Sequence, residues 1–315
     1  MKILNLKILN LKTSNRSERK TAGSRAILAA LIFAFFIFAP LSGPAWPVEE
    51  IFPRSASALR SPYDRAVGRA LENFSDISKS GEGAFAGGIV PHHDLALDMI
   101  VRFYAKLSVS SGRRNVSRVW LFAPDHFRRA KRFVAVCPSD WKLTSGVLSA
   151  DGAAVEALRS MKIVEARSDL FAPEHGITLH IPLIARFFPG ATVVPIVLRP
   201  DIPDLALLRL EKEIRGLAGG GDLVILSMDL SHYNPPEAMA LEDERTLSAL
   251  TEMRPRATGA IDVDARRAAA LVLMLFRDMG AEKGELLEHT DSSALLGRRV
   301  ESGTSYATIL YRLNK

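Results

Sequence analysis

The sequence predicts an α/β protein in which helices cover both faces of a buried sheet. Short apolar segments typical of strands alternate with longer segments of helical spacing from residue 84 to the end of the chain. Residues 118–123 (RVWLFA) and 222–227 (DLVILS) lack polar alternation, which is typical of strands buried on both faces. The chain has 315 residues, 48% of them hydrophobic, and no repeat or second low-complexity segment interrupts it after residue 60. We therefore expect one large domain over residues 61–315.

The predicted strands are short runs rich in Val, Ile, Leu and aromatic residues. They cover residues 84–90, 118–123, 133–136, 192–198, 222–227 and 305–311. Pro195 lies inside the fourth of these segments and cannot donate a hydrogen bond to a neighbouring strand. We therefore expect residues 192–198 at an edge of the sheet or at a bulge.

The predicted helices have apolar residues every three or four positions. In residues 94–107 the apolar positions 97, 100, 101, 104 and 107 share one helical face. Further helices are predicted at residues 151–159, 177–188, 203–218 and 264–279. Pro182 predicts an interruption of the second of these, because proline removes a helical hydrogen bond.

The positive charge of the chain is concentrated at its beginning. Residues 1–45 contain seven Lys and Arg residues and one Glu, whereas residues 46–315 contain 34 basic and 34 acidic residues. A neutral body lacks the basic surface that phosphate binding requires. We therefore expect no nucleic-acid partner.

The same beginning has the layout of a targeting segment. The basic residues lead into an uncharged apolar run at residues 26–39, followed by Pro40 and the small residues 42–45. This order predicts a signal peptide cleaved near Ala45, or a signal anchor in the inner membrane through residues 26–46 if it is not cleaved. A buried core helix is the alternative interpretation. Residues 1–45 are thus assigned as leader and 46–60 as linker.

The leader predicts where the rest of the chain resides. By the positive-inside rule, the basic end stays in the cytoplasm and the body is exported to the periplasm or another extracytoplasmic space. Cys137 is the single cysteine of the chain, which excludes an intramolecular disulfide and is compatible with an oxidising compartment.

Histidines follow three of the predicted strands. His92 and His93 come after residues 84–90, His126 comes after residues 118–123, and His232 comes after residues 222–227. In an open α/β sheet, ligands bind beyond the carboxyl ends of the strands, so one shared site is expected there. Neutral imidazoles ligate metals, and the nearby acidic residues can orient them or act as ligands themselves.

A further pair of histidines is less suited to hold a metal by itself. His175 and His180 are five residues apart, a spacing that does not place both on one face of a helix. The segment also differs from the His-Glu-x-x-His motif of zinc hydrolases.

Five short motifs in order resemble the signature of the Memo family, which includes the AmmeMemoRadiSam system protein B. They are Val90-Pro91-His92, Ala123-Pro124-Asp125-His126, Glu174-His175 with Ile181-Pro182, Val194-Pro195-Ile196, and the segment from Ser227 to Tyr233 (SMDLSHY). The resemblance implies a single three-layer αβα domain with a mixed sheet, like that of LigB-type extradiol dioxygenases. Those enzymes hold a non-haem Fe(II) with two His and a carboxylate.

The resemblance also assigns the candidate metal ligands. His92 and His126 match the first two family histidines. Many members carry a further cysteine that can ligate metal, and Asp262 stands in its place here; a shift of two residues in the alignment would make Asp264 the candidate. Alternatively, Asp262 merely caps the following helix. Two His and a carboxylate favour a divalent transition metal, Fe(II) first, with Cu, Zn or Mn as other options.

The remaining assignments complete a site of extradiol type. His175 and His232 are expected to act as acid and base groups, with Asp229 holding the tautomer of His232; His232 is also an alternative third ligand. The substrate-binding candidates are His93, Glu174, His180 and Tyr233.

The resemblance leaves three hypotheses for function. The first is a non-haem metal-dependent redox enzyme of the extradiol dioxygenase type acting on a small aromatic ligand. The second is a non-catalytic module that binds a metal or a peptide and acts through a protein partner. The third is a metal-dependent hydrolase. The resemblance raises the question of a radical-SAM partner, a cytoplasmic type of enzyme, and the leader puts that partnership in doubt here.

Overall fold

The computed structural model describes residues 84–111, 115–143 and 145–314. The expected leader, the linker and the first residues of the expected domain lie outside these ranges. Among the helices of the described ranges, none combines the length and the apolar composition needed to cross a membrane.

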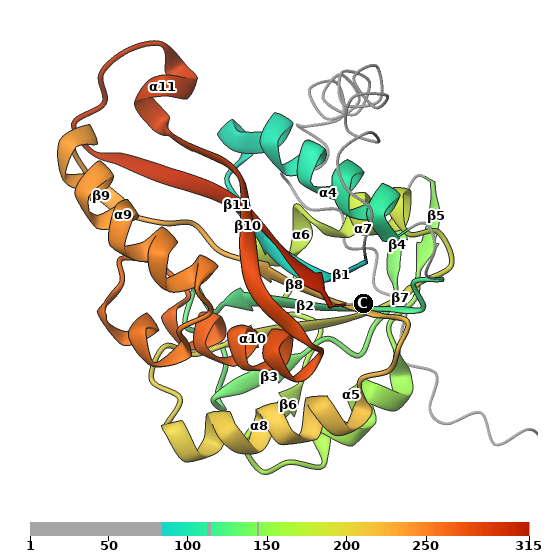
Figure 1. The fold of residues 1–315 in the computed structure, drawn as a ribbon. Helices are drawn as coiled ribbons and strands as arrows, with labels where there is room; N and C mark the ends of the chain where they lie inside the picture. The colour runs from blue at the N-terminus through green and yellow to red at the C-terminus, as the bar shows by residue number, and fades with distance from the viewer. Residues whose placement is uncertain (1–83, 112–114, 144, 315) are drawn as a thin grey trace, which may run out of the picture. The chain divides into compact units, whose positions relative to one another are not determined.

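Four neighbouring parallel strands form the centre of the sheet (Figure 1). In spatial order they are β1 (Phe85–Val90), β8 (Asp222–Ser227), β2 (Arg118–Pro124) and β7 (Thr192–Leu198). Val90 pairs with Ser227, and Phe122 pairs with Leu226, so the carboxyl ends of β1, β8 and β2 lie at one edge of the sheet. The strands expected at these positions are confirmed.

Antiparallel strands flank this centre and make the sheet mixed. β11 pairs with β1 and carries β10 and β9, while β3 pairs with β7 and carries β6. A separate hairpin is formed by β4 and β5. The bounds are β3 (Val134–Val136), β4 (Trp141–Leu143), β5 (Gly146–Leu148), β6 (Val164–Ala166), β9 (His232–Asn234), β10 (Ala281–Asp291) and β11 (Gly303–Leu313).

Helices cover both faces of the sheet, as Figure 1 shows. One face packs against α4 (Leu97–Ser111), α6 (His175–Thr178) and α7 (Ile181–Phe187). The other packs against α5 (Gly152–Arg159), α8 (Asp204–Leu217), α9 (Pro236–Thr251) and α10 (Arg266–Asp278). Three shorter helices join these elements: η1 (Asp94–Ala96), η2 (Pro255–Ala260) and α11 (Ser292–Leu296). The result is a three-layer α/β arrangement.

Alternate residues of β2 explain why its sequence is continuously apolar. Val119 and Leu121 pack into the core on the α4 side, whereas Trp120 and Phe122 pack into the core on the α10 side. A strand presents successive side chains to opposite faces, so a sheet covered on both faces needs apolar residues at every position.

The position of Pro195 differs from the expectation. Its strand β7 is internal, between β2 and β3, rather than at an edge. The Pro195 carbonyl accepts a hydrogen bond from the backbone N–H of Cys137 at 3.2 Å, just beyond the last residue of β3. Pro195 cannot return a hydrogen bond to Cys137, and the pairing of β3 with β7 ends at this position, so the proline interrupts no pairing within β3.

The interruption expected near Pro182 is present. α6 ends at Thr178 and α7 begins at Ile181, so the break precedes the proline. Pro182 lies in the first turn of α7, where its missing N–H has no helical partner in any case.

Candidate metal centre

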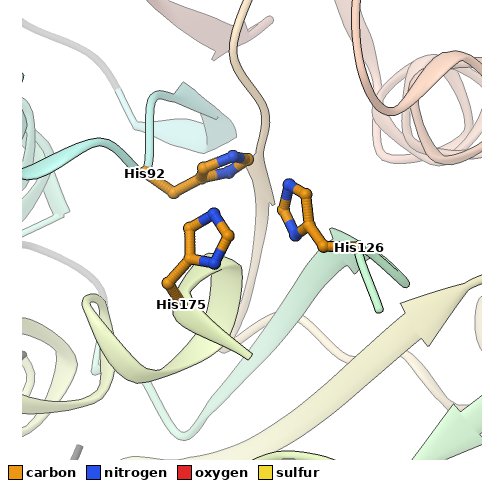
Figure 2. A group of neighbouring side chains, drawn as sticks. All are labelled: His92, His126 and His175. Carbon is orange, nitrogen blue, oxygen red and sulfur yellow. The ribbon is translucent and has the colours of Figure 1, made fainter. Parts of the chain in front are cut away.

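Three histidine side chains meet beyond the carboxyl ends of the parallel strands (Figure 2). His92 follows β1, His126 follows β2, and His175 begins α6. The ring centroids are 4.7 Å apart for His92 and His126, 5.0 Å for His92 and His175, and 4.2 Å for His126 and His175. The shared site expected from the strand ends is thus assembled by contacts between residues far apart in sequence.

Asp264 brings a carboxylate to two of these rings. Its Oδ2 lies 3.0 Å from Nε2 of His92 and 3.4 Å from Nε2 of His126. Both oxygens of Asp264 are buried and have no hydrogen-bond partner among the described residues. The backbone N–H of Asp264 donates to the carbonyl of Asp229 at 3.4 Å, which ties the segment before α10 to the end of β8.

Asp262, the expected third ligand, lies outside this cluster. Its Oδ2 accepts a hydrogen bond from Asn234 Nδ2 at 3.3 Å, and its Oδ1 is 3.8 Å from the Arg266 guanidinium. Its side chain is 34% exposed. The helix start offers no cap role either, because α10 begins after Ala265 without a side-chain cap. Asp264, the candidate of the alignment shifted by two residues, is the carboxylate that lies beside His92 and His126.

Glu174 fixes the orientation of His126. Its Oε1 is 2.6 Å from Nδ1 of His126, and its Oε2 accepts the backbone N–H of His126 at 3.2 Å. Glu174 also caps α6 by accepting the N–H of Gly176 at 3.1 Å. Because Nδ1 of His126 is engaged by this buried carboxylate, Nε2 faces Asp264. Glu174 is therefore a buried support for His126 and not the expected substrate contact.

Ser227 and Asp229 position His92 in a similar way. Nδ1 of His92 is 2.9 Å from Ser227 Oγ, and the backbone N–H of His92 donates to Asp229 Oδ1 at 3.0 Å. Nε2 of His92 is thereby turned toward Asp264. Ser227 also contacts His180, whose Nε2 is 3.1 Å away and whose ring is completely buried. His180 was expected to touch substrate, but it lies behind the cluster.

Asp125 shapes the loop that carries His126. Its carboxylate accepts the backbone N–H groups of Arg129 and Ala130 at 3.0 and 2.9 Å. These bonds turn the chain directly after β2. The Asp125 side chain is buried and engaged in this loop, so its role next to His126 is structural.

His232 takes its tautomer from the backbone. Its Nδ1–H donates to the carbonyl of Leu230 at 2.7 Å, while Asp229 Oδ2 is 3.9 Å from its Nε2. The tautomer is therefore set by Leu230 and not by Asp229, contrary to the expectation. Nε2 of His232 is left as an acceptor.

The other expected substrate-binding residues lie at the surface. His93 precedes η1 and caps it, because its Nδ1 accepts the backbone N–H of Leu95 at 3.2 Å. Tyr233 is 81% exposed and has a positive φ of 59°. The sequence interpretation assigned no role to Phe127, which is half-exposed with its ring centroid 6.2 Å from that of His175. An exposed aromatic residue directly after a site histidine was the available signal.

Electrostatic contacts polarise the cluster. Burial lowers the pKa of His126, but the Asp264 and Glu174 carboxylates outweigh it and raise that pKa to about 10. Burial likewise lowers the pKa of His92, but Asp229 and Asp264 outweigh it and raise that pKa above its ordinary value. Burial alone would raise the pKa of Asp264, but His92 and His126 outweigh it and hold this pKa far below its usual range. Burial and the Asp264 charge raise the pKa of Asp229.

The two remaining rings are held neutral. Burial, together with the neighbouring His92 and His126, lowers the pKa of His175 to about 4. Burial, together with the neighbouring His92 and His175, lowers the pKa of His180 to about 3. The side chain of His175 is nevertheless 44% exposed, so at neutral pH it presents a neutral imidazole to solvent beside the cluster.

The raised pKa of His126 predicts a pH dependence of stability for the metal-free protein. Because the folded-state pKa of about 10 exceeds the ordinary value of 6.5, the stabilisation is complete below pH 6.5 and is lost as the pH rises toward 10. The expected slope is at most about 1.4 kcal/mol per pH unit. Urea unfolding across this range measures it, and His126→Gln should reduce the slope. Equal slopes in the wild-type and His126→Gln proteins would contradict the raised pKa of His126.

The donor set suits a transition metal. Two imidazole nitrogens and one carboxylate oxygen converge, with the far nitrogens of both rings engaged by buried partners. The carboxylate of Asp264 faces both rings, but its oxygens accept no hydrogen bond among the described residues, so a metal ion bound there would give them a ligand contact. Two groups of potential ligands overlap here, His92 with His126 and His175, and His92 with Asp229 and Asp264.

The fold and this site define an α/β protein with a histidine–carboxylate cluster at the carboxyl ends of its parallel strands. The sequence model of the family described as Memo-like protein matches residues 59–310. The chain therefore belongs to the Memo family, and the resemblance expected from its five motifs is confirmed.

Two similar proteins are named MEMO1 family proteins. The chain is 23% identical over 256 residues to a MEMO1 family protein of Nitrosopumilus maritimus (strain SCM1), covering 79% of this chain and 92% of the relative. It is 26% identical over 235 residues to a MEMO1 family protein of Caldivirga maquilingensis, covering 71% of this chain and 82% of the relative. The solved structure of uncharacterized protein JW3007 from Escherichia coli K12 overlaps with a TM-score of 0.39 at 11% identity, covering 67% of this chain and 91% of that one.

Proposed function

We propose that the protein binds one divalent transition metal, Fe(II) first, and is a redox enzyme of the extradiol dioxygenase type acting on a small aromatic substrate. The observation that supports this is the convergence of three donor atoms: Oδ2 of Asp264 lies 3.0 Å from Nε2 of His92 and 3.4 Å from Nε2 of His126. Two histidines and one carboxylate leave coordination positions open. When bound, the metal would supply those positions to substrate and dioxygen together.

His175 is the residue best placed to move a proton. It is neutral at pH 7 because its pKa is lowered to about 4, and its ring stacks on that of His126. A neutral imidazole at the mouth of the cluster can accept a proton from a substrate hydroxyl and return it later. His232 offers a second acceptor, since its Nδ1–H is committed to the Leu230 carbonyl.

The ligand types support the choice of metal. Imidazole nitrogen with carboxylate oxygen suits Fe(II), Mn(II), Zn(II) and Cu(II), whereas Cu(I) prefers sulfur ligands. Cys137 is the only cysteine of the chain, and it is buried in the core around α4 rather than in the metal cluster. A thiolate ligand from this chain is therefore not part of the proposal.

Elemental analysis of the purified full-length protein tests the proposal. We expect about one transition metal per chain, lost in His92→Ala and His126→Ala but retained in His93→Ala, whose exposed ring lies outside the cluster. The Fe(II)-loaded protein should then consume dioxygen with catechol-type substrates. A folded protein that binds no metal rejects the proposal.

The same experiment separates the other hypotheses. Stoichiometric metal without dioxygen consumption would favour a binding module that acts through a protein partner. Cleavage of esters or amides without dioxygen would favour a hydrolase in which His175 serves as base to a metal-activated water.

A further inference from the structure

A buried chain of polar groups runs behind His92, away from the open side of the cluster. Nδ1 of His92 is 2.9 Å from Ser227 Oγ, and Ser227 Oγ is 3.1 Å from Nε2 of His180. His92, Ser227 and His180 are all buried. The chain connects the end of β1, the end of β8 and the turn between α6 and α7.

The surroundings of His180 give no other reason for a polar ring. Its Nδ1 has no hydrogen-bond partner among the described residues, and its ring lies 5.8 Å from that of Tyr104 in the core formed around α4. Burying an imidazole nitrogen without a partner costs free energy. A leucine or phenylalanine would fill such a position without that cost, so the contact with Ser227 is what distinguishes histidine here.

The direction of the hydrogen bonds follows from the protons available. His92 can ligate through Nε2 only when its ring proton is on Nδ1, and this proton then donates to Ser227 Oγ. The hydroxyl of Ser227 has one proton of its own, which needs an acceptor elsewhere. Nε2 of His180, 3.1 Å away, can accept this proton when the neutral ring carries its own proton on Nδ1. Without this acceptor, the hydroxyl would be free to rotate and direct its proton at His92 instead.

We propose that His180 is a positioning residue for the metal centre: by accepting the hydroxyl proton of Ser227, it keeps Oγ oriented to accept from Nδ1 of His92 and leaves Nε2 of His92 free to ligate. This inference rests on the metal site of the proposed function. It also gives the two histidine ligands different supports, a carboxylate for His126 and a neutral relay for His92. The relay acts without touching substrate.

Four variants of the full-length protein test the relay. His180→Phe fills the space without an acceptor, His180→Gln places an amide oxygen near the position of Nε2, and Ser227→Ala removes the hydroxyl. Thr308→Val is the matched control, because the Thr308 hydroxyl is buried and has no hydrogen-bond partner among the described residues. Circular dichroism and urea unfolding confirm that each variant is folded.

Zn(II) affinity, measured by competition with a chelator, is the first readout. We expect a loss of about 10-fold in His180→Phe and up to about 100-fold in Ser227→Ala, the range typical of lost supports behind a metal ligand. His180→Gln should restore most of the affinity, and Thr308→Val should match wild type. A fifth variant, which combines His180→Phe with Ser227→Ala, should bind Zn(II) no more weakly than Ser227→Ala alone, because both changes break one chain of hydrogen bonds.

Exchange of the His92 Nδ1 proton with water in the metal-free protein, followed by ¹⁵N-resolved NMR, is the second readout. The relay predicts faster exchange in His180→Phe and Ser227→Ala, and wild-type exchange in Thr308→Val. Unchanged affinity and unchanged exchange in His180→Phe would overturn the relay while leaving the metal site in place. If wild type binds no Zn(II), the proposed function fails and the exchange rates alone decide the relay.

Discussion

Asp264→Asn is expected to lower the affinity for Fe(II) or Zn(II) by at least about 100-fold, whereas Asp262→Asn leaves it unchanged. Asparagine keeps the size of the side chain and the backbone bond to the Asp229 carbonyl, but it removes the charged oxygen that faces the two rings. Asp262 is engaged with Asn234 and Arg266 instead. The two substitutions are chemically identical and two residues apart.

The comparison is made by elemental analysis after dialysis and by chelator competition on the same preparations. The Asp262→Asn protein is the control for a general effect of removing an acidic residue near the start of α10. Equal metal content in both variants would remove Asp264 from the ligand set. Loss of metal in Asp262→Asn alone would restore the original alignment.

Glu174→Ala is expected to have the largest effect on stability, a loss of about 3–5 kcal/mol in the free energy of unfolding. Glu174 is 1% exposed and is paired with the His126 ring at 2.6 Å. Its removal leaves the His126 ring and backbone N–H without their acceptor and uncaps α6. Several buried donors would then lack partners at once.

Urea unfolding of the metal-free proteins measures this loss. The control is Asp169→Asn, which breaks the ion pair between Asp169 and Arg167. The side chain of Asp169 is 57% exposed. Exposed pairs contribute about 0–1 kcal/mol, so this variant should stay near wild type. A loss in Glu174→Ala as small as that of the control would show that Glu174 is not a buried support of the site.

Local patterns in the sequence predicted the sheet and part of the site. β1, β2 and β8 are apolar without alternation because both faces of the sheet are covered, and that signal needs no knowledge of their neighbours. The ends of these strands predicted one shared site for His92, His93, His126 and His232, and of these His92 and His126 belong to one group of potential ligands. Parallel strands bring their carboxyl ends to one edge whatever their order, so the prediction required only the strand assignments.

Two of the longer elements, β10 and α9, left no usable signal. β10 has the composition AEKGELLEHTD, in which charged residues outnumber apolar ones, and it pairs only with β11 in the described sheet. α9 buries one helical face, but two of the residues on that face, Asp243 and Thr246, are polar, so the sequence shows no apolar stripe. Edge strands and weakly amphipathic helices are held by their neighbours, so their own residues reveal little.

Sequence alone determined the α/β class, the central strands, the family signature and the histidines at the strand ends, because each depends on residues close together in the chain. Tertiary structure alone decided between Asp262 and Asp264, since both precede α10 and only the packing of that segment on β8 directs one carboxylate to His92 and His126. It also decided that Glu174, Ser227 and His180 lie behind the cluster. These roles depend on which atoms of distant segments come within hydrogen-bond distance, and spacing along the chain does not specify that.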